Sequence, residues 1–148
     1  MQTLKIYTDG ACSGNPGAGG WAALLIYGNR KKEISGFAPE TTNNRMELLA
    51  AIEGLRAVKM QPDLKIQLYS DSAYLVNAIN NGWLAAWQQN GWRTSDRGEV
   101  KNRDLWLELV ELNARLSPTF FKVKGHADNP HNNRCDELAV AEIKKRVK

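Results

Sequence analysis

Two segments of the chain alternate apolar and polar residues and end in an aspartate. Residues 4–10 carry Asp9 and residues 64–72 carry Asp71, each close to the end of its alternating run. A period of two is typical of a β-strand with one covered face. If the two strands lie side by side, their carboxylates meet near one sheet edge, close enough to share a cation. A single aspartate at a strand end is more often a turn starter or a helix N-cap, so the repetition favours a functional interpretation.

A helical period follows in residues 45–58, where apolar residues recur three and four positions apart. The polar residues 41–44 precede this segment and suit helix capping. Glu47 is expected in the first turn of the helix, where a favourable interaction with the helix dipole is the ordinary explanation for an acidic side chain. Taken alone, Glu47 therefore indicates no site.

The rest of the pattern predicts strands and helices in alternation. A hairpin at Gly28 and Asn29 is expected to join a strand at residues 21–27 to a third strand at residues 31–37. Further helices are predicted at residues 72–80, 102–112 and 134–148, and a last strand at residues 119–124. Strands joined by short turns indicate an antiparallel meander, whereas strands separated by helices indicate parallel crossovers. The prediction is an α/β domain with a mixed sheet of about five strands flanked by helices, with a ligand at the carboxyl ends of the parallel strands.

Two polar loops interrupt these elements. Residues 13–20 are rich in turn formers, and residues 17–22 match the loose glycine pattern of dinucleotide sites. That pattern requires a helix after it, whereas a strand is expected here, and no P-loop sequence follows. The second loop, residues 125–133, contains His126, which without further context is as often an ordinary surface histidine as a catalytic one.

Tryptophan and basic residues gather after residue 82. Because Trp83 and Trp87 lie one helical turn apart, packing in the core or between helices explains them. Aromatic residues mixed with Arg and Lys also suit a nucleic-acid backbone, and both interpretations stay open. The residues concerned are Trp83, Trp87, Trp92, Trp106, Arg93, Arg97, Lys101 and Arg103.

The totals fit one ordinary domain of 148 residues with 43% hydrophobic residues. Lys and Arg exceed Asp and Glu by 20 to 16, and the resulting net charge of +4 mildly favours a polyanionic partner. The first residues lack the layout of a secretory signal, and the longest apolar run, residues 21–27, is too short to span a bilayer. We therefore expect a cytoplasmic protein with no membrane partner.

The two cysteines, Cys12 and Cys135, are too few for a disulfide framework and are expected to be free thiols. A zinc site formed by both cysteines and His126 is an alternative, because each cysteine neighbours a proposed ligand position. Their spacing matches no recognised zinc motif, which argues against this alternative.

Five motifs in order closely resemble bacterial type 1 ribonuclease H, over nearly the whole chain. They are residues 8–17 (TDGACSGNPG), 41–48 (TTNNRMEL), 70–72 (SDS), 123–127 (VKGHA) and 132–139 (NNRCDELA). The resemblance implies a ribonuclease H-like fold over residues 1–148 as a single catalytic domain. It also implies a metal-dependent endonuclease that cuts the RNA strand of RNA:DNA hybrids and leaves 3′-hydroxyl and 5′-phosphate ends.

The same resemblance implies site residues. Asp9, Glu47, Asp71 and Asp136 would hold two divalent ions, usually Mg²⁺ with Mn²⁺ as a substitute, and His126 would be an auxiliary catalytic residue. The physical reason is independent of the family: phosphodiester hydrolysis needs an activated nucleophile, a neutralised transition state and a stabilised leaving oxyanion, and two hard cations supply all three. Hard cations prefer oxygen ligands, so carboxylates are suited to hold them.

Substrate-binding positions also follow from the resemblance. Asn15, Asn43 and Asn44 match positions that contact the hybrid, and Thr42, Arg45 and Asn102 lie where the family grips a DNA phosphate or supports that grip. Trp83 and Trp87 match the tryptophans of the substrate-binding handle. Ordinary capping and turn formation also explain the polar residues, and the two roles are compatible. The expected partner is an RNA:DNA hybrid, bound by a monomer.

Two departures from the family pattern concern the substrate. Residues 88–90 are Gln, Gln and Asn where bacterial members place several basic residues, which predicts weaker binding and a shallower salt dependence. Ala73 stands where the family often has a glutamine beside the hybrid. A hybrid-binding domain without turnover and a nuclease or integrase-like enzyme acting on DNA alone are the rival functions. The presence of all four carboxylates argues against the first.

Overall fold

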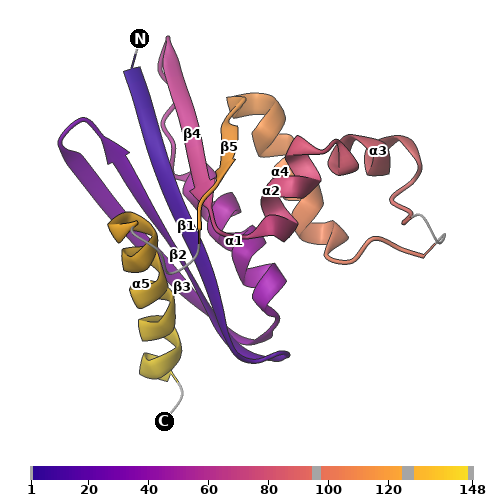
Figure 1. The fold of residues 1–148 in the computed structure, drawn as a ribbon, viewed down its shortest axis with the longest axis horizontal. Helices are drawn as coiled ribbons and strands as arrows, with labels where there is room; N and C mark the ends of the chain where they lie inside the picture. The colour runs from indigo at the N-terminus through magenta and orange to yellow at the C-terminus, as the bar shows by residue number, and fades with distance from the viewer. Residues whose placement is uncertain (1, 95–97, 125–128, 147–148) are drawn as a thin grey trace.

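The computed structural model describes residues 2–94, 98–124 and 129–146. Its centre is a five-stranded sheet in the order β3-β2-β1-β4-β5 (Figure 1). The strands are β1 (Gln2–Gly14), β2 (Gly17–Tyr27), β3 (Arg30–Thr41), β4 (Leu64–Ser70) and β5 (Thr119–Lys122). β1, β2 and β3 pair antiparallel, whereas β4 pairs parallel with both β1 and β5. The predicted mixed α/β sheet is therefore confirmed.

Helices cover both faces of this sheet. They are α1 (Asn43–Arg56), α2 (Ala73–Asn80), α3 (Trp83–Gln89), α4 (Arg103–Leu116) and α5 (Pro130–Arg146). α1 packs on β1, β2 and α4, while α5 lies on the opposite face against β1, β2 and β3 (Figure 1). Within the described part of the chain, no helix has both the length and the apolar composition needed to cross a membrane.

Two hydrophobic cores follow from the alternation along β1. Ile6 points into the larger core with Leu48, Ile52 and Trp106, between the sheet and the α1 side. Tyr7, the next residue, points into the smaller core under α5, where it meets Leu24, Cys135 and Ala139. Successive strand residues face opposite sides of a sheet, so one strand serves both cores.

The prediction of a turn-rich segment at residues 13–20 is wrong for most of its length. β1 continues to Gly14 and β2 begins at Gly17, which leaves Asn15 and Pro16 between them. The glycines of β2 serve close packing instead: a Cβ on Gly20 would lie 2.1 Å from the backbone oxygen of Ala139 in α5. Glycine in a strand marks a close backbone approach as readily as a turn.

The boundaries of the last strand and helix also differ from the prediction. β5 ends at Lys122, and α5 begins at Pro130, so residues 130–133 are helical and not part of a loop. Asn129 Oδ1 accepts a hydrogen bond from the backbone N–H of Asn132 at 3.0 Å, and proline suits the first position of a helix. The predicted loop contained these start signals among its polar residues.

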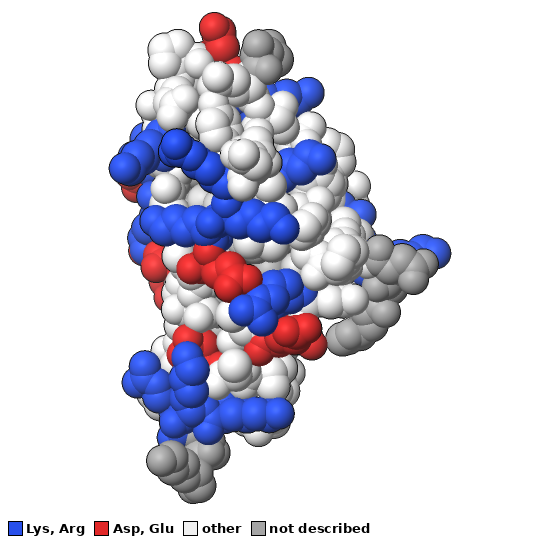
Figure 2. Space-filling view, turned by 90° about the vertical axis from the view of Figure 1, so that its left-hand side faces the viewer, with Lys and Arg blue, Asp and Glu red and all other residues white. Residues whose placement is uncertain are grey.

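Ionic contacts join α5 to the edge strand β3. Figure 2 shows this side of the molecule, where groups of Lys and Arg alternate with clusters of Asp and Glu. Arg134 pairs with Glu33 at 2.7 Å, and the Ser35 hydroxyl donates to the Glu142 carboxylate at 2.6 Å. These contacts help to fix α5, which carries Asp136.

Candidate active site

The strand pairing brings Asp9 and Asp71 together. Thr8 on β1 is the register partner of Ser70 on β4, so the aspartates that follow them lie at the same level of adjacent strands. Asp9 is only 4% exposed and still belongs to β1, whereas Asp71 follows the end of β4. This is the juxtaposition predicted from the two alternating segments.

Glu47 reaches the same place from α1. The Thr42 hydroxyl accepts a hydrogen bond from the backbone N–H of Arg45 and caps the helix, which begins at Asn43. Glu47 is therefore beyond the first turn, so the predicted first-turn position is wrong and the ordinary explanation by the helix dipole does not apply. It is 5% exposed, and its backbone is so close to β1 that a Cβ on Gly10 would lie 2.6 Å from the Glu47 nitrogen.

Four carboxylates surround one open pocket of about 300 Å³. Asp9, Glu47 and Asp71 each place a carboxylate oxygen within 4.8 Å of those of the other two. Asp136 of α5 lines the same pocket and acts electrostatically on Asp9. The four predicted metal ligands therefore come from four separate elements or their ends and meet in one place.

This arrangement is costly for the isolated protein. Burial, followed by repulsion from Asp71 and Asp136, raises the pKa of Asp9 to about 8. Burial, followed by repulsion from Asp9 and Asp71, raises the pKa of Glu47 well above its usual value. Among the described residues, none hydrogen-bonds the buried Oε1 of Glu47. Crowded carboxylate oxygens with an orphan acceptor among them suit a hard divalent cation such as Mg²⁺ or Mn²⁺.

Polar residues beside the pocket are already held in place. Asn15 Oδ1, between β1 and β2, accepts a hydrogen bond from the backbone N–H of Asn43 at 3.1 Å. Asn43 lines the carboxylate pocket, and Asn44 is exposed next to it. Asn15 and Asn43, two of the three asparagines predicted to contact a hybrid, thus lie at one rim of the site, and Asn44 follows Asn43 in the chain.

A second group forms where the N-terminal ends of α1 and α4 meet. Arg45 donates to Asn102 Oδ1 at 3.3 Å and makes a two-pronged ion pair with Asp104 at 2.9 and 2.7 Å. Asn102 Nδ2 donates to the Tyr74 hydroxyl at 3.0 Å. Thr42, Arg45 and Asn102 are therefore brought together as predicted. Tyr74 and Asp104 were not predicted to take part, although an acidic residue beginning α4 was a visible signal.

The structure separates the tryptophans into two kinds. Trp106 is fully buried and Trp92 nearly so, which supports the packing interpretation for both. Trp87 lies between them, with ring centres 6.2 Å from Trp92 and 5.5 Å from Trp106. Trp83, at the start of α3, is 46% exposed, so it alone of these four presents a large free surface.

The remaining predicted residues divide into thiols and a loop histidine. Cys12 and Cys135 are free, as predicted, and burial raises the pKa of Cys135 to about 12. The Cys135 thiol donates to the backbone oxygen of Tyr7 at 3.2 Å. Neither cysteine belongs to a cluster able to hold a metal within the described ranges, so the zinc alternative gains no support. His126 and Arg97 lie outside the described residues.

Comparisons with known proteins agree with this geometry. The family model described as RNase H matches residues 1–144. The ribonuclease H of Chlorobaculum parvum is 62% identical over 143 residues, covering 97% of each chain. That of Caldanaerobacter subterraneus subsp. tengcongensis is 59% identical over 147 residues, covering 99% of this chain and 95% of the relative.

Solved structures give the same result. LC9-RNase H1, a type 1 RNase H with the type 2 active-site motif, has a TM-score of 0.85 at 30% identity, covering 97% of this chain and 73% of that one. LC11-RNase H1, solved in complex with an RNA/DNA hybrid, has a TM-score of 0.72 at 22% identity, covering 98% and 99%, and supports the fold alone. The resemblance found in the sequence is therefore confirmed, and the chain belongs to the ribonuclease H family of hydrolytic nucleases.

Proposed function

We propose that this enzyme is an endonuclease that hydrolyses the RNA strand of RNA:DNA hybrids with two Mg²⁺ ions and leaves 3′-hydroxyl and 5′-phosphate ends. The observation that carries the proposal is the meeting of Asp9, Glu47, Asp71 and Asp136 around one open pocket. The match to the RNase H family model and the ribonucleases H that are 59% and 62% identical to this chain support the substrate class.

The carboxylates would act as metal ligands. When bound, two hard cations neutralise the phosphate, activate the attacking water and stabilise the leaving oxygen. Asp9, Glu47 and Asp71 would hold one ion together, and Asp136 would complete the second position from α5. Because Asp9 and Glu47 are buried on a strand and a helix, they hold their oxygens in fixed positions before substrate arrives.

The rim residues would recognise the hybrid. An asparagine amide both donates and accepts hydrogen bonds, so Asn15, Asn43 and Asn44 suit the 2′-hydroxyls that distinguish RNA from DNA. Thr42 and Asn102 would contact a phosphate of the DNA strand, with Arg45 supporting them because Asp104 already pairs with its guanidinium. The exposed Trp83 and its partly buried neighbour Trp87 would contact the nucleic-acid backbone of the bound hybrid.

His126 would assist proton transfer or product departure, since imidazole titrates near neutral pH.

We further propose that residues 1–148 act as a single-domain monomer in the cytoplasm. Sedimentation of the purified protein at several concentrations tests the monomer, and a single sedimenting species with the mass of two chains would contradict it.

Cleavage of a matched panel of duplexes tests the proposed substrate and metal. RNA:DNA, RNA:RNA and DNA:DNA duplexes of one sequence are incubated with Mg²⁺, with Mn²⁺ and with a chelator, and the product ends are mapped. We expect cutting of the RNA strand in the hybrid alone, only with a metal, and with 5′-phosphate products. Cutting of a DNA strand, or equal cutting with the chelator, would contradict the proposal.

A further inference from the structure

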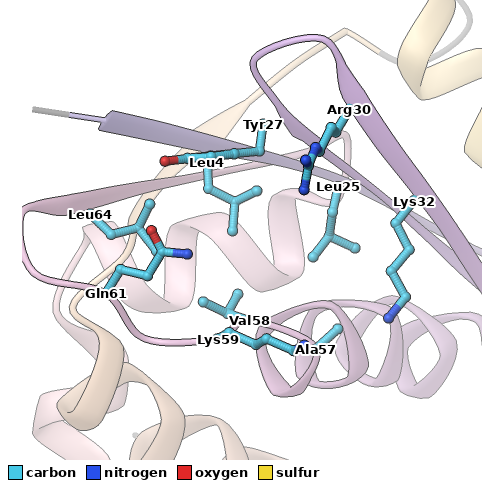
Figure 3. Close-up of a pocket in the computed structure, with 10 residues that line it drawn as sticks. All are labelled: Leu4, Leu25, Tyr27, Arg30, Lys32, Ala57, Val58, Lys59, Gln61 and Leu64. Atoms are coloured by element: carbon cyan, nitrogen blue, oxygen red, sulfur yellow. The ribbon is translucent and has the colours of Figure 1, made fainter.

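A second pocket lies far from the carboxylates, at the other end of the same strands. It has a volume of about 290 Å³ and opens between the β2–β3 hairpin and the end of α1 (Figure 3). Leu4 and Leu64, which line it, stand near the starts of β1 and β4. Leu4 precedes Asp9 by five residues, so at the rise of an extended strand the two are about 17 Å apart along β1.

One part of the pocket is hydrocarbon. Leu4 and Tyr27 are register partners on β1 and β2, and Leu25 lies two residues from Tyr27 on the same face of the sheet. Val58 and Leu64 close this part from the end of α1 and the start of β4. These side chains border the larger core, but they leave an opening beside it.

The other part of the pocket is cationic. Arg30 and Lys32 alternate with Lys31 along β3, so they project to the pocket side while Lys31 projects to the other face. Figure 3 shows Arg30 and Lys32 extending from the hairpin toward α1, on the side away from Leu64, and Lys59 runs along the base toward Ala57. No acidic residue is among the lining residues, and no salt bridge between described residues involves Arg30, Lys32 or Lys59.

We propose that this pocket binds a small organic anion with a hydrocarbon body and a single phosphate, sulfonate or carboxylate group. The anionic group would pair with Arg30, Lys32 and Lys59, which otherwise concentrate positive charge. The hydrocarbon body would cover the partly buried Val58 and Leu64 and so remove apolar surface from water. Most ligand pockets combine an apolar wall with a few convergent polar groups in this way.

The lining favours a hydrocarbon over a nucleobase. A buried base needs partners for several donors and acceptors. The uncharged polar side chains that line the pocket are Gln61 and Tyr27, and the Tyr27 hydroxyl already donates to Gln2. A nucleoside monophosphate would therefore place its base against Val58 and Leu64, where few uncharged polar side chains could pair with it.

Calorimetric titration of the full chain with octyl phosphate below its micelle concentration tests the proposal. Inorganic phosphate, 1-octanol and adenosine monophosphate serve as comparisons. We expect saturable one-to-one binding of octyl phosphate that is about tenfold or more tighter than binding of each of the other three. Equal binding of inorganic phosphate, or absence of saturable octyl phosphate binding, would overturn it.

Charge variants on the two faces of β3 locate the site. Arg30→Gln/Lys32→Gln should weaken octyl phosphate binding by about tenfold, whereas Lys31→Gln, on the opposite face of the same strand, should change it by less than about twofold. All three residues are exposed, so the melting temperature of each variant should stay close to that of the parent chain. Lys31→Gln removes one charge and the double variant removes two, so a loss of about threefold in Lys31→Gln would show attraction by net charge alone and would refute the pocket.

Discussion

Thr8 and Ser70 face each other across the parallel pair of β1 and β4, and this single register sets Asp9 beside Asp71. A shift of one residue would turn one of the two carboxylates to the other face of the sheet. The buried side chains on each side of both strands prevent that shift. The core therefore fixes the carboxylate site, although none of the buried core residues that the structure describes lines its pocket.

Asp71→Asn should abolish turnover while the fold persists. The amide keeps the shape of the carboxylate but removes its charge, so the oxygen binds a divalent cation poorly. We expect a loss of about 1,000-fold or more in kcat on an RNA:DNA hybrid, with an unchanged circular dichroism spectrum. Asp63→Asn, an exposed substitution of the same kind, is the control and should keep full activity. If Asp71→Asn cleaves the hybrid as fast as the parent enzyme, Asp71 is not needed for catalysis.

The metal-free enzyme should lose stability as pH rises from about 4 to about 8. The pKa of Asp9 is about 8 in the folded protein, against 3.8 for an ordinary aspartate. Between these values the folded state holds a proton that the unfolded state releases, so raising the pH favours unfolding. Asp9→Asn should therefore raise the melting temperature in chelator by about 3 °C or more at pH 8, and by less at pH 5.

Thermal unfolding at both pH values checks this prediction. Asp63→Asn again removes one exposed negative charge and should show the same melting temperature change at pH 5 and pH 8. A gain in Asp9→Asn that does not depend on pH would mean that the burial of the Asp9 charge and its repulsion by Asp71 and Asp136 are not the cause.

Magnesium should stabilise the folded protein. The proposed site exists only in the folded chain, so Mg²⁺ at about 100 times its dissociation constant should add about 2.7 kcal/mol to the free energy of unfolding. The melting temperature should rise with Mg²⁺ concentration in the parent enzyme and much less in Asp9→Asn. NaCl at equal ionic strength separates binding from screening; an equal rise in NaCl would argue against a specific site.

Restoring positive charge on α3 should strengthen substrate binding. Gln88 and Gln89 are exposed, whereas the Asn90 side chain is hydrogen-bonded to the backbone of Arg93 and is best kept. Gln88→Lys/Gln89→Lys should bind the hybrid more tightly, with a slope of log K against log salt that is steeper by about 1 to 2. Gln88→Glu/Gln89→Glu should do the reverse. If neither pair changes the slope, α3 does not approach the hybrid.

Trp83 and Trp106 should respond in opposite ways to truncation. Trp83→Ala removes an exposed ring and should weaken hybrid binding by about 1 kcal/mol while changing stability by less than about 0.5 kcal/mol. Trp106→Ala empties a fully buried position and should cost about 3 to 5 kcal/mol of unfolding free energy. Denaturant unfolding and binding titrations on both variants check the contrast, and a large stability loss in Trp83→Ala would contradict it.

The sheet and the pairing of Asp9 with Asp71 could be predicted from the sequence, because both follow from the alternation of apolar and polar residues along two strands. The glycines of β2 were predicted to form a turn. Gly20 is instead needed because the backbone of Ala139, more than a hundred residues away, leaves no room for a side chain. The depth of Glu47 was also hidden, since it depends on where α1 begins and how closely α1 approaches Gly10. The contact of Arg45 with Asp104 joins two helices whose relative placement no local pattern gives.

The close approach at Gly20 links a remote strand position to the chemistry. At Gly20 the backbone of β2 meets the backbone of α5 with no side chain between them, and α5 is the element that carries Asp136. In Gly20→Ala the added methyl group would overlap the backbone oxygen of Ala139, so α5 would have to move away from β2. The absence of a Cβ atom at Gly20 therefore helps to set the spacing between Asp136 and the other three carboxylates.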